Sequence, residues 1–219
     1  MYYAVNGLAL WCDTQGSGPP LLLLHGNGED HTIFDRLAQA LEDRFTLILP
    51  DSRCHGKSTR LPSLTYDDLA DDTFALIDRL GLERPFVCGF SDGGITALML
   101  AAAHPSLFRA VAVCGANTCP GGLKASARAG IALHAAATGS MLDRMMQTGP
   151  HIRIAQLQQI DVPTLVLAGS RDLIRPVDTR RIAKNIPGAQ MRILPGETHG
   201  SYVVHSDKLA PILTEFFGA

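Results

Sequence analysis

The chain has 219 residues, of which 46% are hydrophobic and 18% charged, a balance that excludes an intrinsically disordered protein and predicts one domain over residues 1–219. Its formal net charge of −2 at pH 7 selects no polyanion, so nucleic acid is not an expected partner. The longest apolar stretches, 19–24 and 95–103, are far shorter than the roughly 18 residues of a membrane span, and the N-terminal segment lacks signal-peptide features. We therefore expect no membrane partner and a cytoplasmic location.

Along the chain, short apolar runs alternate with amphipathic stretches. Residues 2–5 and 8–11 flank Asn6-Gly7, a pair that favours the type I′ turn of a β-hairpin. Apolar runs without polar alternation are typical of strands buried in a parallel sheet, and apolar residues three and four apart indicate helices. Strands are expected at 21–24, 45–49, 86–88, 110–114, 162–168 and 191–194, and helices at 33–41, 66–80, 92–103, 178–186 and 205–217. This order predicts an α/β fold, a mostly parallel sheet with helices on both faces.

Residues 117–159 interrupt the alternation of strands and helices. This segment contains a helix-like patch at 126–137, followed by Met141, Met145 and Met146 at helical spacing. We expect an insertion between two strands that forms a small helical lid. The three methionines are interpreted first as core packing residues, because methionine commonly fills irregular apolar space.

Five cysteines are scattered over the chain: Cys12, Cys54, Cys88, Cys114 and Cys119. An odd, dispersed set does not indicate a disulfide framework, so reduced thiols are expected. No cluster of histidines completes a zinc site with them, and no metal is expected.

One segment has the pattern of a catalytic nucleophile. Gly89-Phe90-Ser91-Asp92-Gly93 fits G-x-S-x-G and lies between a predicted strand and a predicted helix. On such a tight turn the serine hydroxyl is exposed at the carboxyl end of the sheet, and the glycines allow strand and helix to cross closely. The alternative is an ordinary N-cap serine, but a cap does not require glycines on both sides.

A serine hydroxyl needs a base, which is usually a histidine held by a carboxylate. In this kind of fold the chain order is serine, acid, histidine. His199 lies in the loop directly after the strand expected at 191–194 and fits the order. His205 is expected to begin a helix and to lie on the surface.

The acid predicted from the sequence is Asp172, which follows the strand expected at 162–168. Sites in such sheets form at the carboxyl ends of strands. Asp161 precedes the same strand and faces the wrong end, and Asp178 is interpreted as a helix cap. Glu197 lies close to His199 in sequence and is the less favoured alternative.

The first predicted parallel strand ends in His25-Gly26-Asn27-Gly28. Acyl transfer needs backbone N–H groups aimed at the developing oxyanion, and this loop together with the amide of Asp92 could supply a pair. A dinucleotide-binding loop is the competing interpretation. It is disfavoured because the third glycine of G-x-G-x-x-G is replaced by His31.

Together these segments resemble the α/β-hydrolase superfamily over essentially the whole chain, and the Ser-Asp-Gly-Gly elbow is similar to the branch that contains valacyclovir hydrolase and its biphenyl-hydrolase-like relatives. The family's R-G-H-G-x-S loop is matched by residues 53–58, with Cys54 where glycine is usual. The resemblance implies a catalytic triad of nucleophile Ser91, orienting acid Asp172 and base His199. It also implies oxyanion donation from Asn27 and Asp92, with no metal and no organic cofactor.

The function that this resemblance implies is hydrolysis of a small-molecule carboxylic ester through an acyl-enzyme. A lactonase, a thioesterase or a C–C bond hydrolase would use the same triad, and a non-enzymatic ligand receptor on the same fold is the alternative of another class. The Asp92 carboxylate has two interpretations. It is a helix-end acid stabilised by the helix dipole, or it reaches the pocket rim and binds a cationic group of the substrate.

Overall fold

A computed structural model describes residues 1–218 of the chain. The strands are β1 (Tyr2–Val5), β2 (Leu8–Gln15), β3 (Pro20–Leu24), β4 (Thr46–Pro50), β5 (Phe86–Phe90), β6 (Ala110–Cys114), β7 (Thr164–Gly169) and β8 (Gln190–Leu194). The helices are α1 (Asp35–Leu41), α2 (Tyr66–Arg79), α3 (Asp92–Ala103), α4 (Ala125–Thr138), α5 (Met141–Thr148), α6 (Ile154–Leu157), α7 (Pro176–Asn185) and α8 (Leu209–Phe217). Short 3₁₀ turns cover His31–Phe34 and Pro120–Gly122.

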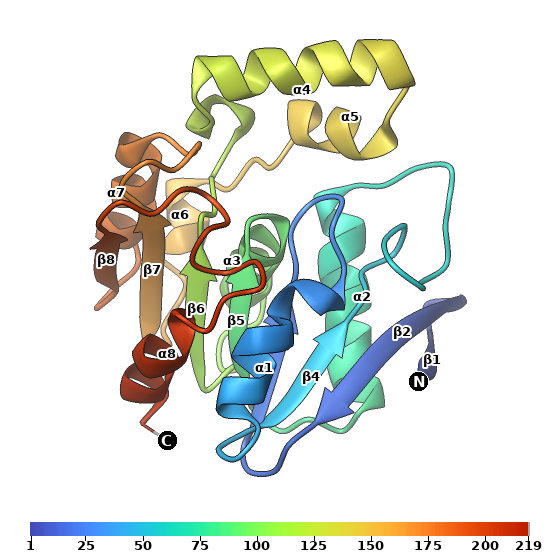
Figure 1. The fold of residues 1–219 in the computed structure, drawn as a ribbon, viewed down its shortest axis with the longest axis vertical. Helices are drawn as coiled ribbons and strands as arrows, with labels where there is room; N and C mark the ends of the chain where they lie inside the picture. Colours follow the sequence, from blue (N-terminus) through green and yellow to red (C-terminus); the bar gives the residue numbers. More distant parts are fainter. Residues whose placement is uncertain (219) are drawn as a thin grey trace.

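The strands form one sheet in the order β1-β2-β4-β3-β5-β6-β7-β8 (Figure 1). In this order, every neighbouring pair between β4 and β8, including both pairs made by β3, is parallel. Only the pairs of β2 with β1 and with β4 are antiparallel. The predicted α/β fold with a mostly parallel sheet is therefore confirmed. Because parallel strands all point one way, their carboxyl ends lie along one edge of the sheet, which is the upper edge in Figure 1.

The hairpin at the start of the chain is also confirmed. Asn6 and Gly7 both have positive φ angles, 50° and 78°, as a type I′ turn requires. The side chain of Asn6 donates a hydrogen bond of 2.9 Å to Asp72 on α2, which fixes the hairpin tip against that helix.

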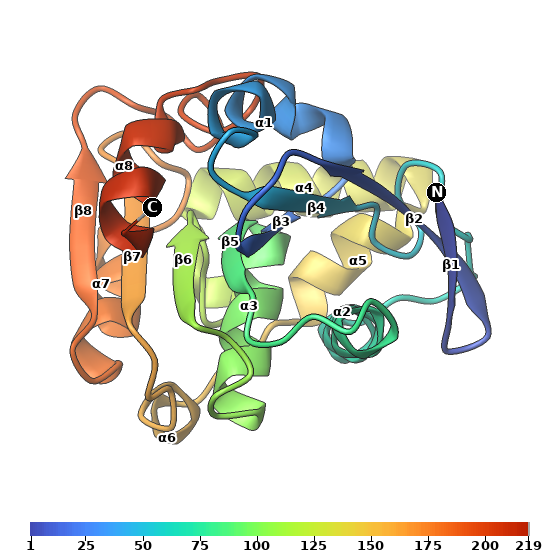
Figure 2. The ribbon, with the colours of Figure 1, turned by 90° about the horizontal axis from the view of Figure 1, so that it is seen from below.

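Helices cover both faces of the sheet, and alternate residues of each strand supply the two cores (Figure 2). Leu21 and Leu23 of β3 pack on the face covered by α1 and α8. Leu22 and Leu24 pack on the opposite face, with α2 and α3. This is why the strand sequence is apolar without a break.

Two expected elements differ from the structure. The strand expected at 191–194 is not buried on both faces, since β8 lies at the sheet edge and leaves Met191 and Ile193 41% and 42% exposed. The last helix begins at Leu209, and not at residue 205 as predicted. His205 has a φ of 48°, outside the helical region, and its backbone N–H donates to the carbonyl of Ile33. This hydrogen bond between distant parts of the chain holds residue 205 outside the helix, which therefore begins later in the sequence than predicted.

The predicted insertion folds as α4 and α5, which lie beyond the carboxyl ends of the strands (Figure 1). The two helices are joined at Gly139, which has the left-handed conformation, and His134 on α4 pairs with Asp143 on α5. Met145 is buried in the core, as expected for a packing residue, whereas Met146 lines a cavity beneath α4. Within residues 1–218 no helix is both long and apolar enough to cross a bilayer.

The glycines of the strand-to-helix crossing give a test of this fold. A Cβ on Gly89 would overlap the carbonyl of Gly93, so we expect Gly89→Ala to lower the free energy of unfolding by about 2–3 kcal/mol. Gly130, inside α4, has nothing within 4 Å of such a Cβ, and Gly130→Ala should raise stability by up to about 1 kcal/mol. Urea unfolding of both variants measures the contrast. Equal midpoints would contradict the close crossing.

Candidate active site

Ser91 lies at the turn between β5 and α3 in a strained backbone conformation, with a φ of 51°. Its backbone N–H donates to the carbonyl of Cys114 at 2.8 Å, which ties the turn to β6. A Cβ on Gly93 would overlap the carbonyl of Leu24, so only glycine permits α3 to begin this close to β3. The serine hydroxyl makes no capping hydrogen bond to α3, which excludes the N-cap alternative.

Three side chains that the sequence selected separately meet at this turn. The Nε2 atom of His199 lies 3.1 Å from Ser91 Oγ, and its Nδ1 atom lies 2.7 Å from Asp172 Oδ1. With its proton on Nδ1, the ring donates to the carboxylate and leaves Nε2 to accept from the serine. The loops after β5, β7 and β8 therefore bring nucleophile, acid and base candidates into hydrogen-bonding contact.

Asp172 is buried and remains a carboxylate. Burial alone would raise its pKa, but the hydrogen bond and the charge of His199 outweigh that effect and lower it. The backbone N–H groups of Ile174 and Gly169 also donate to this carboxylate, at 2.9 and 3.3 Å. These bonds fix the carboxylate so that it can hold the imidazole in one orientation.

The other acids considered from the sequence have different partners. Glu197 accepts from Lys208 Nζ at 2.7 Å and from Ser201 Oγ at 2.6 Å, and it makes no hydrogen bond to His199. Asp178 was predicted to cap a helix, and this prediction is wrong, because α7 starts two residues before it, at Pro176. It is buried and accepts from the amide and the hydroxyl of Thr118, so it anchors the loop after β6.

The two residues expected to stabilise an oxyanion lie side by side. Asn27 and Asp92 both line the same cavity as Ser91, and Asn27 Nδ2 donates to Asp92 Oδ2 at 2.9 Å. Asp92 is the first residue of α3, and the first amides of a helix have no partner within it. Donation from these two amides to an oxyanion stays a prediction.

One interpretation expected the Asp92 carboxylate to reach the pocket rim. In the structure it is turned into the protein instead. It is only 4% exposed, and burial raises its pKa. Each carboxylate oxygen already accepts from the protein, one from Asn27 and the other from the hydroxyl of Tyr66 at 2.8 Å. The carboxylate thus ties the loop after β3 and the start of α2 to the nucleophile turn.

Sequence reasoning missed Glu29 and Tyr66. Glu29 lines the cavity, and its Oε2 accepts from the amide of Gly26 at 3.0 Å; burial raises its pKa. A Cβ on Gly26 would lie 2.6 Å from Glu29 Oε2 and 3.1 Å from the Cβ of Ser91, so both side chains border one small space. The position of Glu29 after a parallel strand was a usable signal. Tyr66 gave none, because its place depends on how α2 packs.

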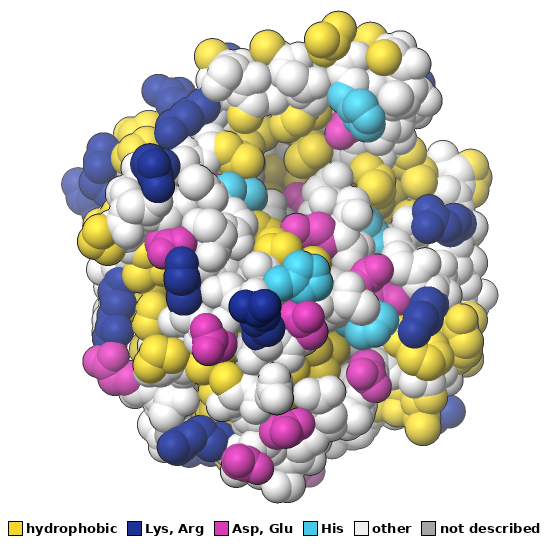
Figure 3. Space-filling view, viewed as in Figure 1, with side chains coloured by type: hydrophobic (Ala, Val, Ile, Leu, Met, Phe, Trp, Pro, Cys, Tyr) yellow, Lys and Arg dark blue, Asp and Glu magenta, His cyan; other side chains and the backbone are white. Residues whose placement is uncertain are grey.

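The cavity beneath α4 has a volume of about 520 Å³, and Figure 3 shows the hollow with hydrophobic side chains on its walls. Its described polar lining consists of Asn27, Glu29, Tyr66, Ser91, Asp92, Asn117 and His199. No lysine or arginine among residues 1–218 lines it, whereas two carboxylates do. The described lining therefore offers no cationic side chain to a substrate carboxylate next to Ser91.

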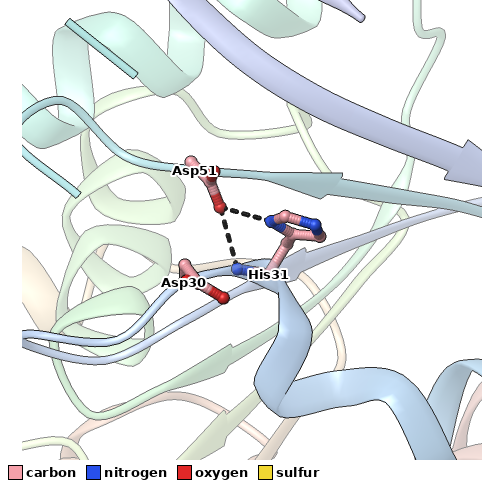
Figure 4. A group of neighbouring side chains, drawn as sticks. All are labelled: Asp30, His31 and Asp51. Atoms are coloured by element: carbon pink, nitrogen blue, oxygen red, sulfur yellow. Dashed lines mark hydrogen bonds and ion pairs between the residues drawn. The ribbon is translucent and has the colours of Figure 1, made fainter. Parts of the chain in front are cut away.

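A buried network holds the loops around the cavity. Asp51 Oδ1 accepts from both the backbone N–H and the ring Nδ1 of His31, at 2.9 and 2.6 Å (Figure 4). Its Oδ2 accepts from the backbone N–H of Lys57 at 2.8 Å. With Asp30, these side chains have the composition of a metal-ligand group. Since the Asp51 oxygens already accept from the chain, the group is explained as a loop anchor. Cys54, where the family has glycine, adopts a glycine-like φ of 67°.

Comparison with known proteins identifies relatives of this fold. Residues 19–137 match the family model described as alpha/beta hydrolase fold. The serine hydrolase BPHL of Mus musculus is 38% identical over 52% of this chain and 42% of its own length. The 3-oxoadipate enol-lactonase 1 of Acinetobacter baylyi is 29% identical over 44% of this chain and 36% of its own length. The aligned stretch therefore spans less than half of either relative.

Among solved structures, the enol-lactonase from Burkholderia xenovorans superposes with a TM-score of 0.87 at 23% identity, over 100% of both chains. At this identity the superposition shows the shared fold alone. The predicted resemblance to the α/β-hydrolase superfamily and to its biphenyl-hydrolase-like branch is confirmed.

The loop network predicts a pH dependence of stability. His25 is buried, donates from Nδ1 to the carbonyl of Gly26 and accepts from Ser52 at Nε2; burial lowers its pKa to about 4. Between pH 6.5 and 4 the unfolded chain binds a proton there that the folded protein does not, so stability falls as pH falls, by about 3 kcal/mol from this group. Urea unfolding across this range measures the loss.

The matched variants are His25→Gln and His151→Gln, the second at an exposed position. We expect His25→Gln to be less stable at pH 7 but to lose less stability on acidification than the wild-type protein. His151→Gln should keep the wild-type dependence. An unchanged slope in His25→Gln would show that another group causes the loss.

Proposed function

The chain belongs to the alpha/beta hydrolase fold family, and on that premise we propose that it is a serine hydrolase that cleaves carboxylic esters of small molecules through an acyl-enzyme. The observation that supports the proposal is the hydrogen-bonded series Ser91–His199–Asp172 at the wall of an apolar cavity. A hydroxyl nucleophile with a base and an oriented acid is the arrangement that acyl transfer needs.

In the proposed mechanism, His199 Nε2 takes the proton of Ser91 as Oγ attacks the ester carbonyl carbon. The carbonyl oxygen becomes an oxyanion, which the amides of Asn27 and Asp92 stabilise. The tetrahedral intermediate collapses, the C–O bond to the leaving group breaks, and the alcohol receives the proton from His199. Water, deprotonated by His199, then attacks the acyl-enzyme. The bond from the acyl carbon to Ser91 Oγ breaks, His199 returns the proton to Oγ, and the carboxylic acid is released. Asp172 stabilises the imidazolium in both steps.

Lactones are internal esters, and thioesters react by the same steps, so both are alternatives for the same residues. The name of the enol-lactonase relative favours the lactone alternative. A C–C bond hydrolase or a non-enzymatic ligand receptor would use the same cavity. Turnover separates the receptor from the enzymes, because a receptor binds the ester without releasing the alcohol.

We further propose that α4 and α5 form a lid over the site. Ser91 and His199 are only partly buried at the wall of the cavity of about 520 Å³, so the cover over the site is incomplete. This supports a preference for small and medium acyl groups and for substrates that are uncharged next to the scissile bond.

The first test is an activity screen with Ser91→Ala as the blank. Short and long acyl esters, aminoacyl esters, lactones and thioesters are compared by initial rates. We expect short and medium esters to be cleaved, and Ser91→Ala and His199→Ala each to lower kcat by about 10³-fold or more, because the three residues act as a unit. Asp172→Asn should cost on the order of 10⁴-fold by changing the histidine tautomer.

Glu197→Gln is the matched control for Asp172→Asn, since both remove a carboxylate near His199. Because Glu197 bonds to Lys208 and Ser201, its variant should keep near-normal rates. Loss of activity in Glu197→Gln but not in Asp172→Asn would overturn the assignment of the acid.

The second test concerns the interpretation in which the Asp92 carboxylate binds a cationic group of the substrate. Because both carboxylate oxygens already bind Asn27 and Tyr66, we expect Asp92→Asn to disturb the site equally for all substrates. The kcat/KM should fall about 10-fold on aminoacyl esters and on neutral esters alike. A loss confined to aminoacyl esters would instead show that Asp92 binds the substrate amine.

A further inference from the structure

A second hollow lies on another flank of α4. We call it the outer groove; its volume is about 430 Å³, and α4 contributes Ala125, Arg128, Ala129, Ile131 and Ala132 to it. The active-site cavity is lined by Ala127, Gly130 and Ile131 of the same helix. Because successive residues of an α-helix are rotated by about 100°, these two sets of side chains face different sides of α4. The helix therefore lies between the two spaces.

The outer groove and the active-site cavity adjoin each other and share a wall of three side chains. Leu123, Ile131 and Met146 line both spaces. Ile131 and Met146 are only partly buried, and a methionine side chain has three rotatable bonds with which to change its shape. A substrate chain that displaces this wall would pass beneath α4 from Ser91 to the outer groove.

The outer groove is lined mainly by apolar side chains, with one cationic exception. Arg128 is its only charged lining residue within the described part of the chain, and it has no hydrogen bond or ion pair from its side chain there. Lys124 lies one helical turn earlier. Arg175 lies on the neighbouring strand-like segment, where its amide donates to Gly122 at 2.7 Å. In Figure 3, lysine and arginine side chains gather over α7 and the start of α4.

The surrounding segment does not neutralise this charge. Residues 118–190 contain nine lysines and arginines but only four acids: Asp143, Asp161, Asp172 and Asp178. Asp143, Asp172 and Asp178 are buried, and each has a partner within the chain: His134, His199 and Thr118 respectively. Asp161 precedes β7 and therefore lies toward the opposite edge of the sheet.

We propose that the outer groove binds the terminal carboxylate of an ester whose acyl chain passes beneath α4, with Arg128 as its partner. The proposal rests on the serine hydrolase function proposed above. Glu29 and Asp92 beside Ser91 repel a carboxylate close to the scissile bond, whereas Arg128 attracts one at the far end. The space beneath α4 therefore favours substrates whose ester group and terminal carboxylate are far enough apart to reach Ser91 and Arg128 together.

This gives a charge preference that reverses with chain length. Monomethyl esters of dicarboxylic acids from succinate to sebacate are compared with neutral partners in which the free carboxylate is a carboxamide, and methanol release gives kcat/KM. For short acids we expect the neutral partner to be cleaved faster. For long acids the anionic ester should be cleaved about 2- to 5-fold faster than its neutral partner.

Arg128→Gln should abolish the advantage of the long anionic esters and leave the neutral series unchanged. Arg180→Gln, which removes the same charge from an exposed position on α7 outside the groove, should keep the advantage. The proposal would be overturned if the ratio of the rates for the anionic and the neutral ester were the same at every acyl-chain length. It would also be overturned if Arg128→Gln and Arg180→Gln changed that ratio equally.

Failure of the two proposals can be told apart. If the wild-type protein turns over none of the esters, lactones and thioesters of the activity screen, the hydrolase function fails. Calorimetric titration of Ser91→Ala with monomethyl suberate, with and without Arg128→Gln, still measures the groove. Binding of this ester that is unaffected by Arg128→Gln would overturn the carboxylate site, whatever the catalytic result.

Discussion

The close crossing of β5, α3 and β3 is the constraint on which the site depends. Gly89 and Gly93 bring the backbones together to a distance that excludes a Cβ, and the turn between them forces Ser91 to a φ of 51°. The sheet core below and α3 above hold this strained residue in place. The nucleophile position is therefore set by backbone packing. The histidine and the acid reach it from loops that follow other strands.

The loops that follow β3, β4 and β6 are held by buried carboxylates. Asp51 joins the loops after β3 and β4, Asp92 joins the loop after β3 to α2, and Asp178 holds the loop after β6. A buried charge is tolerated only when hydrogen bonds satisfy it, so each of these acids fixes the backbone or side chains around it. Irregular loops at the carboxyl edge of the sheet thereby become a rigid frame around Ser91.

Charge is distributed unevenly around the cavity that this frame encloses. Carboxylates border the nucleophile, whereas lysine and arginine side chains gather on the surface over α7 and the start of α4 (Figure 3). The acids near Ser91 are there because they anchor the loops, as Glu29 does through the amide of Gly26. The electrostatic character of the site thus follows in part from the bonds that shape it.

The sequence by itself determined the α/β fold, the elbow at Ser91 and the selection of Asp172 and His199. These depend on local patterns: apolar periodicity, glycine spacing, and a position directly after a strand. Only the tertiary structure decided that Tyr66 lines the cavity, that the Asp92 carboxylate is buried, and that the last helix begins at Leu209. The physical reason is that each of these depends on side-chain packing and hydrogen bonds between segments far apart in the chain, which no local pattern encodes.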